Sequence, residues 1–241
     1  MNIFAFDSSG KTASVCVVQQ ERLVYQKLLD RGLTHSETLL PLIQEAFAAT
    51  ALSPGQVGRY AVTAGPGSFT GLRIGLAMAK GLALPFHTPL VPVSTLQAYA
   101  EACGLLGTVI CSLDARRSEV YWAAFKLTES GCTRLTPDAA APAAQVCQWL
   151  SGQTEPVFFI GGGTEICYNV CSPALLPLFG PSPSGIIPAR GAALAALHSE
   201  GIEAALAQPV YLRLSQAERE RAARLQTKLP QYPIKGEISF E

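Results

Sequence analysis

Two aspartates, Asp7 and Asp114, are the first candidates for chemistry because they occupy equivalent places in the sequence. Each ends an apolar stretch, precedes a tight turn and is followed by a second apolar stretch about eight residues later. Carboxylates at facing strand ends could hold Mg²⁺ through water beside the phosphates of a nucleotide, and Ser8 and Ser9 would belong to the same site. Each aspartate could equally cap its own turn, and for Asp114 this second interpretation is favoured.

Two glycine-rich stretches are further candidates for nucleotide contacts. The first, from residue 65 to 75, separates a predicted strand from a predicted helix, where backbone N–H groups could approach a phosphate. Its spacing, Gly-x-Gly-x-x-x-Gly, fits neither common nucleotide fingerprint. The second stretch follows an apolar run and predicts either a surface for an adenine or a tight turn. It consists of Gly161, Gly162 and Gly163.

Small residues recur every four positions along the helix predicted after the first glycine stretch, at Gly71, Gly75, Ala79 and Ala83. They lie along one side of that helix and allow a second backbone to approach closely. That backbone could belong to the protein's own sheet or to another subunit. If it belongs to another subunit, Gly75→Leu should separate the partners and leave the fold intact. The candidate interface residues are Gly71, Leu72, Arg73, Gly75, Leu76, Ala79, Leu82 and Ala83.

Histidine and cysteine do not occur at the spacing of a metal site. The three histidines are far apart, and none of the seven cysteines forms a Cys-x-x-Cys pair. We expect the cysteines to be small buried residues in a reducing compartment. His35 is expected to tie down the start of a helix. The sequence therefore assigns no catalytic residue and no metal ligand.

The composition is that of a globular protein that can bury a core. Apolar residues make up 49% and charged residues 15% of the chain, and 18 basic residues balance 18 acidic ones. This excludes a surface that is strongly basic throughout and grips nucleic acid by itself. We expect a soluble, cytoplasmic protein, because no secretory signal and no membrane-spanning stretch is evident.

The hydrophobic pattern alternates between strands and helices, which predicts an α/β fold. A Thr-x-x-Glu capping box at Thr34 marks the start of one helix, which runs to about residue 50. Strands are predicted at 2–6, 13–18, 23–29, 60–64, 105–113, 119–126 and 156–160. Further helices are predicted at 71–84, 143–150 and 192–206.

The chain also repeats itself after about a hundred residues. The segment Ile-Phe-Ala-Phe-Asp, which ends at Asp7, aligns with Ile-Cys-Ser-Leu-Asp, which ends at Asp114. In both places a tight turn and a second predicted strand follow the aspartate. This predicts two related halves, although an unrelated second domain is the alternative. We divide the chain into an N-terminal domain at 1–102, a C-terminal domain at 103–213, and a charged helix and loose tail at 214–241, which could become ordered only on a partner.

Several motifs together resemble the TsaB (YeaZ) family. They are Asp7-Ser8-Ser9, His35-Ser36, the run 65–75, Asp114-Ala115-Arg116-Arg117 with Glu119-Val120-Tyr121, and Pro209 to Arg213. The resemblance covers residues 1–126 well and the remainder in patches. It implies two RNase-H-like halves of the actin-like and Hsp70-like (ASKHA) ATPase fold, which agrees with the repeat.

The resemblance also implies a function. Members of the family act in the cytoplasm in making threonylcarbamoyladenosine (t6A) at position 37 of ANN-decoding tRNAs. They support the relative TsaD, which transfers the threonylcarbamoyl group from threonylcarbamoyl-AMP, together with the small ATPase TsaE. The helix after the glycine loop is the family's dimerisation surface, which favours an intersubunit role for that helix and a homodimer when the chain is alone.

The catalytic relative carries a His-x-x-x-His metal pair, whereas the matching residues 93–99 here contain no histidine. Serine, threonine and tyrosine are poor ligands for a transition metal. We therefore expect a non-catalytic scaffold with no cofactor of its own, and the complex could bind ATP and Mg²⁺. The alternative is an ATP-dependent phosphotransferase that uses Asp7 and Asp114 with Mg-ATP. A metallopeptidase would need histidine ligands that this stretch lacks.

Overall fold

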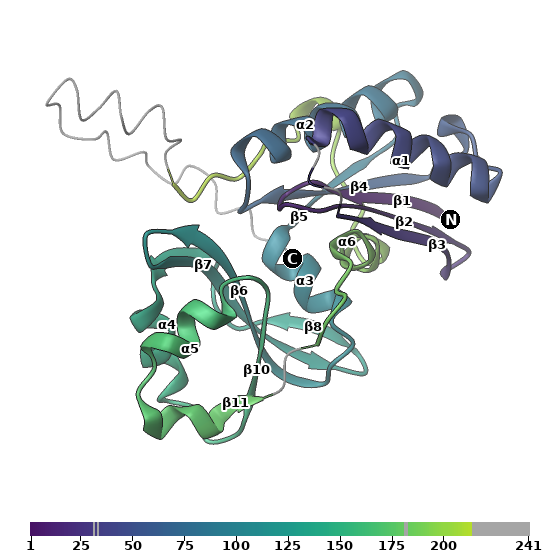
Figure 1. Ribbon diagram of the computed structural model, residues 1–241. Helices are drawn as coiled ribbons and strands as arrows, with labels where there is room; N and C mark the ends of the chain where they lie inside the picture. The colour runs from purple at the N-terminus through teal and green to yellow at the C-terminus, as the bar shows by residue number, and fades with distance from the viewer. Residues whose placement is uncertain (31, 33, 181–182, 214–241) are drawn as a thin grey trace, which may run out of the picture.

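A computed structural model describes residues 1–30, 32, 34–180 and 183–213. The charged helix and tail that the sequence predicts at 214–241 lie outside the described residues. Two lobes stand side by side, and each is built on one sheet (Figure 1). Their apolar strands are buried between helices, as the hydrophobic runs predict.

The first sheet has the order β3-β2-β1-β4-β5. Strand β2 is antiparallel to both of its neighbours, β1 and β3, and β4 and β5 run parallel to β1. The bounds are β1 Asn2–Asp7, β2 Ala13–Gln19, β3 Arg22–Leu29, β4 Arg59–Gly65 and β5 Leu90–Ser94.

The second sheet has the order β11-β10-β6-β7-β8, and β9 also pairs with β7. Here β6, β7 and β8 are antiparallel neighbours, and β10 and β11 are parallel to β6. The bounds are β6 Gly107–Arg116, β7 Glu119–Thr128, β8 Gly131–Arg134, β9 Ala139–Pro142, β10 Val157–Ile160 and β11 Phe179–Gly180.

The two sheets share one topology, which confirms the prediction of two related halves. A central strand pairs on one side with an antiparallel hairpin and on the other side with parallel strands, and β6 takes the place of β1. Asp7 and Asp114 consequently stand at equivalent ends of β1 and β6. The fold class implied by the resemblance, two RNase-H-like halves in an actin-like and Hsp70-like arrangement, is confirmed.

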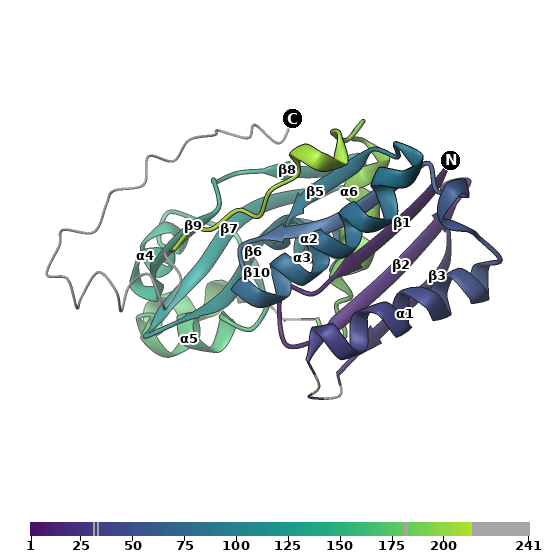
Figure 2. The same ribbon diagram turned by 90° about the horizontal axis from the view of Figure 1, so that it is seen from above.

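Helices cover both faces of each sheet (Figures 1 and 2). In the first lobe, α1 His35–Thr50 and α2 Phe69–Ala83 lie on the outer face. In the second lobe, α4 Ala143–Leu150 and α5 Thr164–Val170 do so. The Thr34–Glu37 capping box begins α1 as predicted. The Ser68 hydroxyl oxygen caps α2 by accepting a hydrogen bond from the Gly71 N–H.

The layer between the two sheets contains α3 Thr95–Ala102 and α6 Pro188–Leu197. Leu96 and Ala100 of α3, a helix that follows the first sheet, pack into the core of the second sheet. Ala192 and Ala196 of α6, which follows the second sheet, pack on the first. The helix α3 therefore packs on both sheets, since its Ala98 lies in the core of the first, and α6 packs on the sheet of the half that precedes it in sequence.

The last predicted helix is also shorter than expected. We predicted a helix at 192–206, but α6 ends at Leu197. Gly201 has a positive φ of 78°, and Ile202 forms a bridge with Leu90 at the edge of β5. A short 3₁₀ turn, Ala204–Leu206, follows. The tertiary contact with β5 thus overrides the helical propensity of the alanines.

One pair of cysteines differs from the expectation of unpaired thiols. Cys147 on α4 and Cys171, directly after α5, form a disulfide that closes a separation of 24 residues. The other five cysteines are unpaired, and Cys16, Cys111 and Cys167 are buried. Among the described residues, no helix combines the length and the apolar character needed to cross a bilayer.

Candidate functional site

Asp7 is a buried carboxyl group at the end of β1, with only 1% of its surface exposed. Its Oδ1 atom accepts hydrogen bonds from the Ser9 hydroxyl (2.5 Å), the Ser9 N–H (3.1 Å) and the Thr63 hydroxyl (2.5 Å). Its Oδ2 atom has no partner among the described residues. Burial raises the pKa of Asp7 because the charged form loses its hydration, while these hydrogen bonds act in the opposite direction.

Ser8 and Ser9 hold the β1–β2 turn against the start of α2. The Ser8 hydroxyl donates to the carbonyl oxygen of Gly71 (2.8 Å), and the Ser9 carbonyl accepts the N–H of Ser68 (2.7 Å). Both serines are buried. Their polar groups are thus already used inside the lobe, and their predicted nucleotide contacts remain a prediction.

Asp114, the counterpart of Asp7, is exposed and caps its own turn. Its Oδ1 accepts the backbone N–H of Arg116 at 2.6 Å. This agrees with the second of the two interpretations given for Asp114. The sequence symmetry therefore places the two aspartates at equivalent strand ends but in different surroundings, one buried and one in solvent.

The glycines after β10 form a tight turn against β6. The Gly163 N–H donates to the Ser112 carbonyl at 2.8 Å. A Cβ atom added at Gly163 would lie 2.9 Å from the carbonyl carbon of Ser112, and one at Gly161 would collide with the Ser112 oxygen. Only Gly162 has open space around it. The turn interpretation therefore fits Gly161 and Gly163, because close backbone packing requires glycine there.

The row of small residues on α2 faces the protein's own interior. A Cβ atom at Gly75 would lie 2.5 Å from the Ser8 hydroxyl oxygen, and one at Gly71 would collide with the Ser8 carbonyl. This close approach argues against the expectation that Gly75→Leu leaves the fold intact. Among the candidate interface residues only Arg73 is exposed, and Leu82 is half-buried. The buried ones are Gly71, Leu72, Gly75, Leu76, Ala79 and Ala83.

The opposite side of α2 faces solvent through Arg73, Ala77 and Gly81. Large apolar side chains are exposed directly beyond it: Leu84 is 45% and Phe86 51% exposed. Leu206 is 65% exposed in the 3₁₀ turn that α2 holds through a hydrogen bond from the Lys80 amine to the Ala205 carbonyl. A surface for a partner on α2 would consist of these residues, which the small-residue pattern did not indicate.

The end of the described chain binds to α2 and then to the second lobe. The Tyr211 ring stacks on Phe69, with 4.5 Å between the centroids, and its hydroxyl accepts a hydrogen bond from Arg73. Arg213 forms an ion pair with Glu119 (2.7 Å) and donates to the Ala115 carbonyl. Sequence analysis missed these contacts because they join residues roughly 100 to 140 positions apart.

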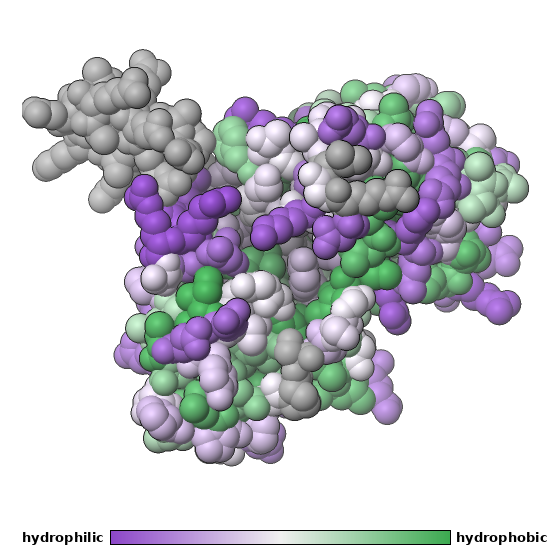
Figure 3. Space-filling view, in the orientation of Figure 1, coloured by the Kyte–Doolittle hydropathy of each residue, from purple (hydrophilic) through white to green (hydrophobic). Residues whose placement is uncertain are grey.

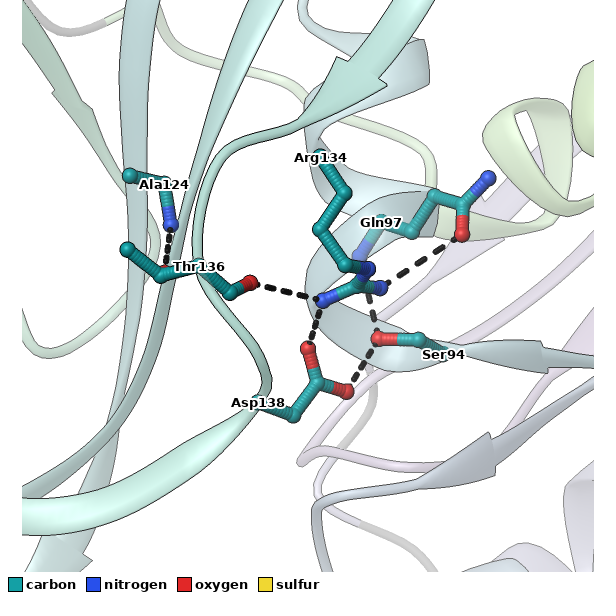
Figure 4. A network of polar contacts seen from close by, with 6 residues as sticks. All are labelled: Ser94, Gln97, Ala124, Arg134, Thr136 and Asp138. Atoms are coloured by element: carbon teal, nitrogen blue, oxygen red, sulfur yellow. Dashed lines mark hydrogen bonds and ion pairs between the residues drawn. The ribbon is translucent and has the colours of Figure 1, made fainter. Parts of the chain in front are cut away.

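A polar network connects the two lobes near α3 (Figure 4). The Ser94 hydroxyl donates to Asp138 at 2.5 Å, and Asp138 forms an ion pair with Arg134. Arg134 also donates to the side-chain oxygen of Gln97 at 3.5 Å. Ser94 and Gln97 come from the first lobe, and Arg134 and Asp138 from the second. No spacing in the sequence indicated this network.

A cavity of about 510 Å³ opens beside this network, between β5, α3, β8 and α6. It is lined by Gln97, Glu101, Cys132 and His198, among others. Burial raises the pKa of Glu101, and it raises the pKa of the Cys132 thiol to about 12. The cavity therefore favours an uncharged thiol, which is a poor nucleophile and a poor metal ligand.

The residues at the position of the relative's metal pair are used for packing. In α3, Thr95 is fully buried, and burial raises the pKa of Tyr99. Across the described parts of the chain, no three His, Cys, Asp or Glu side chains come together as a metal site.

Comparisons with known proteins agree with this fold. The family model for TsaD, tRNA N6-adenosine threonylcarbamoyltransferase, matches residues 32–207. The tRNA threonylcarbamoyladenosine biosynthesis protein TsaB of Haemophilus influenzae is 37% identical over 126 residues, 51% of this chain and 52% of that protein. The TsaB protein of Escherichia coli is 34% identical over 135 residues, covering 54% and 58%. The aligned part thus spans little more than half the length of these two relatives.

The solved structure of YeaZ from Pseudomonas aeruginosa extends the match over both lobes. It is 26% identical, covers 88% of this chain and 99% of that chain, and superposes with a TM-score of 0.72. The TsaB protein of Bacillus subtilis is 27% identical over 170 residues, covering 69% of this chain and 73% of that protein. The chain belongs to the TsaB (YeaZ) family, within the wider group that the TsaD model describes.

Proposed function

We propose that this chain is a non-catalytic subunit that binds a TsaD-type relative and so supports t6A formation on ANN-decoding tRNAs, together with a TsaE-type ATPase. The relatives named as tRNA threonylcarbamoyladenosine biosynthesis proteins support the pathway. In this proposal the relative transfers the threonylcarbamoyl group to N6 of adenosine 37, and this chain supplies a binding surface.

The observation that carries the proposal is the solvent-facing side of α2. Ala77 and Gly81 are exposed and have no bulky side chain on this side of the helix. Large apolar side chains are exposed after its C-terminal end, at Leu84 and Phe86, and at Leu206 in the turn bonded to Lys80. Small residues next to exposed apolar side chains favour close contact with another helix, because apolar area is then removed from water. The glycines on the other side of α2 hold this helix on its own sheet and thereby fix the surface in place.

The surroundings of Asp7 argue against the alternative, a phosphotransferase that uses Asp7 and Asp114 with Mg-ATP. Asp7 is buried, and its Oδ1 atom already accepts three hydrogen bonds, which leaves only its Oδ2 atom for an ion. The alternative predicts ATP turnover by the isolated chain that is lost in Asp7→Asn.

Light scattering coupled to size exclusion tests the proposal, on the chain alone and mixed with its TsaD-type relative, with ATP turnover measured on each sample. We expect a one-to-one complex and no turnover by the chain alone. Ala77→Arg should abolish the complex, because a charged side chain then stands in the middle of the surface. Gln26→Arg on β3, also exposed, is the matched control and should bind normally. Turnover without a complex would contradict the proposal.

A further inference from the structure

The turn between β6 and β7 has an unusual backbone. Arg116 pairs with Glu119, so Arg117 and Ser118 form a two-residue loop. The φ angles of Arg116, Arg117 and Ser118 are 66°, 59° and 61°. Two-residue hairpin loops with positive φ at both positions favour Asn-Gly, because other residues are strained there. This turn instead carries arginines, at a cost in free energy.

The surrounding structure holds the turn in this conformation. The Asp114 side chain accepts the Arg116 N–H, and the Ser118 carbonyl accepts the Ala143 N–H at 3.3 Å. Strained residues persist where neighbouring contacts fix them, and they occur often at functional sites. The arginines are therefore displayed on a fixed support.

The two acidic side chains near the turn, Asp114 and Glu119, already have partners, whereas the side chains of Arg116 and Arg117 do not among the described residues. Arg213 is paired with Glu119, and Asp114 is bound to the backbone. Arg116 and Arg117 are exposed, and within the described residues neither side chain has a hydrogen bond or ion pair. Figure 3 shows hydrophilic side chains gathered on this end of the second lobe, beside the point where the described chain ends.

We propose that Arg116 and Arg117 bind phosphate groups of the tRNA, an inference that rests on the proposed function. A guanidinium group presents a planar fork of donors that matches a phosphate. An acidic protein partner fits less well, because protein interfaces have an apolar centre and the tip of this hairpin exposes Arg116, Arg117 and Ser118 without a large apolar side chain. Because the chain has no net charge, it does not attract RNA as a whole. A local cluster of positive charges such as this one would supply the attraction.

The test is the binding of an unmodified transcript of an ANN-decoding tRNA, followed by fluorescence anisotropy over a range of salt concentrations. It uses the chain alone and the chain with its TsaD-type relative. The double variant Arg116→Asn/Arg117→Asn removes both guanidinium groups, and asparagine tolerates positive φ, so the turn keeps its shape. The double variant Arg116→Lys/Arg117→Lys keeps the charge. The control Arg22→Gln/Arg190→Gln removes two exposed charges elsewhere on the chain.

We expect the asparagine variant to bind the tRNA about tenfold more weakly near physiological salt, with the slope of log affinity against log salt reduced by about 1.5 to 2. The lysine variant should keep the slope, and the control should match the wild type. Association with the relative should be unchanged in all three variants.

Equal affinity and slope in the asparagine variant would overturn the inference and leave the proposed function standing. The inference would also fall if no tRNA binding is seen with or without the relative, or if the asparagine variant keeps tRNA affinity and loses a protein partner. If no complex forms and the asparagine variant still weakens tRNA binding by the chain alone, the inference stands and the proposed function fails.

Discussion

Gly75 and Gly81 lie six residues apart on α2 and have opposite surroundings. A Cβ atom at Gly75 would meet the Ser8 hydroxyl at 2.5 Å and Val62 at 3.4 Å, whereas nothing lies within 4 Å of one at Gly81. Residue type alone could not separate them, because both are small residues in the same helix. Only the position of Ser8, far away in sequence, decides which side of α2 is filled.

We predict that Gly75→Leu lowers the free energy of unfolding by about 3 kcal/mol or more, because the side chain must displace Ser8 and the β1–β2 turn. Gly81→Leu is the matched substitution on the open side and should not lower stability. Urea denaturation of both variants measures this. A Gly75→Leu protein as stable as the wild type would show that the turn can move aside.

Asp7 should make stability depend on pH. The pKa of Asp7 is 3.8 without the effects of the fold and is raised in the folded protein. Between the pKa of the unfolded state and that of the folded state, the folded state binds more protons, so stability falls as the pH rises. Asp7→Asn cannot ionise and keeps an acceptor for Ser9 and Thr63. Its stability relative to the wild type should therefore increase from below pH 3.8 towards neutral pH.

Urea unfolding of Asp7→Asn and wild type across that pH range gives the difference directly. Glu129→Gln, an exposed carboxyl replaced in the same manner, is the control for a general effect of removing an acid. A difference between Asp7→Asn and wild type that does not change with pH would contradict the predicted linkage.

Among the elements, those with strong local signals were predictable. The capping box marked the start of α1, and apolar runs bounded by turn residues located β1 to β4, β6, β7 and β10. The strands β5, β8, β9 and β11 and the helix α3 were missed. The packing of α6 on the first sheet was not predictable, because an alanine-rich helix carries no signal for the sheet on which it packs. The end of α6 was missed for a related reason: Ile202 pairs with Leu90, which is 112 positions away.

The contact between α3 and α6 leads to a prediction for these elements. A Cβ atom at Gly191 on α6 would collide with the carbonyl group of Ala98 on α3. Gly191→Ala should therefore separate the helices and lower the free energy of unfolding by about 1 to 3 kcal/mol. Gly81→Ala is the same substitution at an open helical position, and it should raise stability by up to about 1 kcal/mol. Thermal unfolding of both proteins tests the pair, and equal effects would contradict the argument.

On the scale of the whole molecule, the network of Ser94, Gln97, Arg134 and Asp138 joins the lobes. The side chains of Arg134 and Asp138 are 24% and 11% exposed. The candidate site was predictable only in part: Asp7 followed from the repeat, but the network depends on how the lobes are placed. No pattern along the chain records that placement, because each partner comes from a different half.

We predict that Arg134→Ala lowers the free energy of unfolding by about 2 to 4 kcal/mol, since the largely buried Asp138 carboxylate then loses its charged partner and keeps only the hydrogen bond from the Ser94 hydroxyl. Lys27→Ala removes an exposed ion pair with Glu45, and it should cost about 1 kcal/mol or less. Calorimetry should also show broader, less cooperative unfolding for Arg134→Ala, as the lobes become uncoupled. A loss no larger than that of Lys27→Ala would mean that other contacts, such as the packing of α3 and α6 and the Arg213 contacts, join the lobes.

The strand β6 is held near both of its ends. The chain enters the second lobe at Gly107, where β6 begins, and Arg213 grips the backbone at Ala115, near its other end. Gly107 and Ala115 are eight residues apart along the strand, a distance of about 26 Å. The Arg213 contact therefore holds the second lobe at a point far along β6 from Gly107. Arg116 and Arg117 stand next to Ala115, so a ligand bound to them would lie beside the contact that the end of the described chain makes with the second lobe.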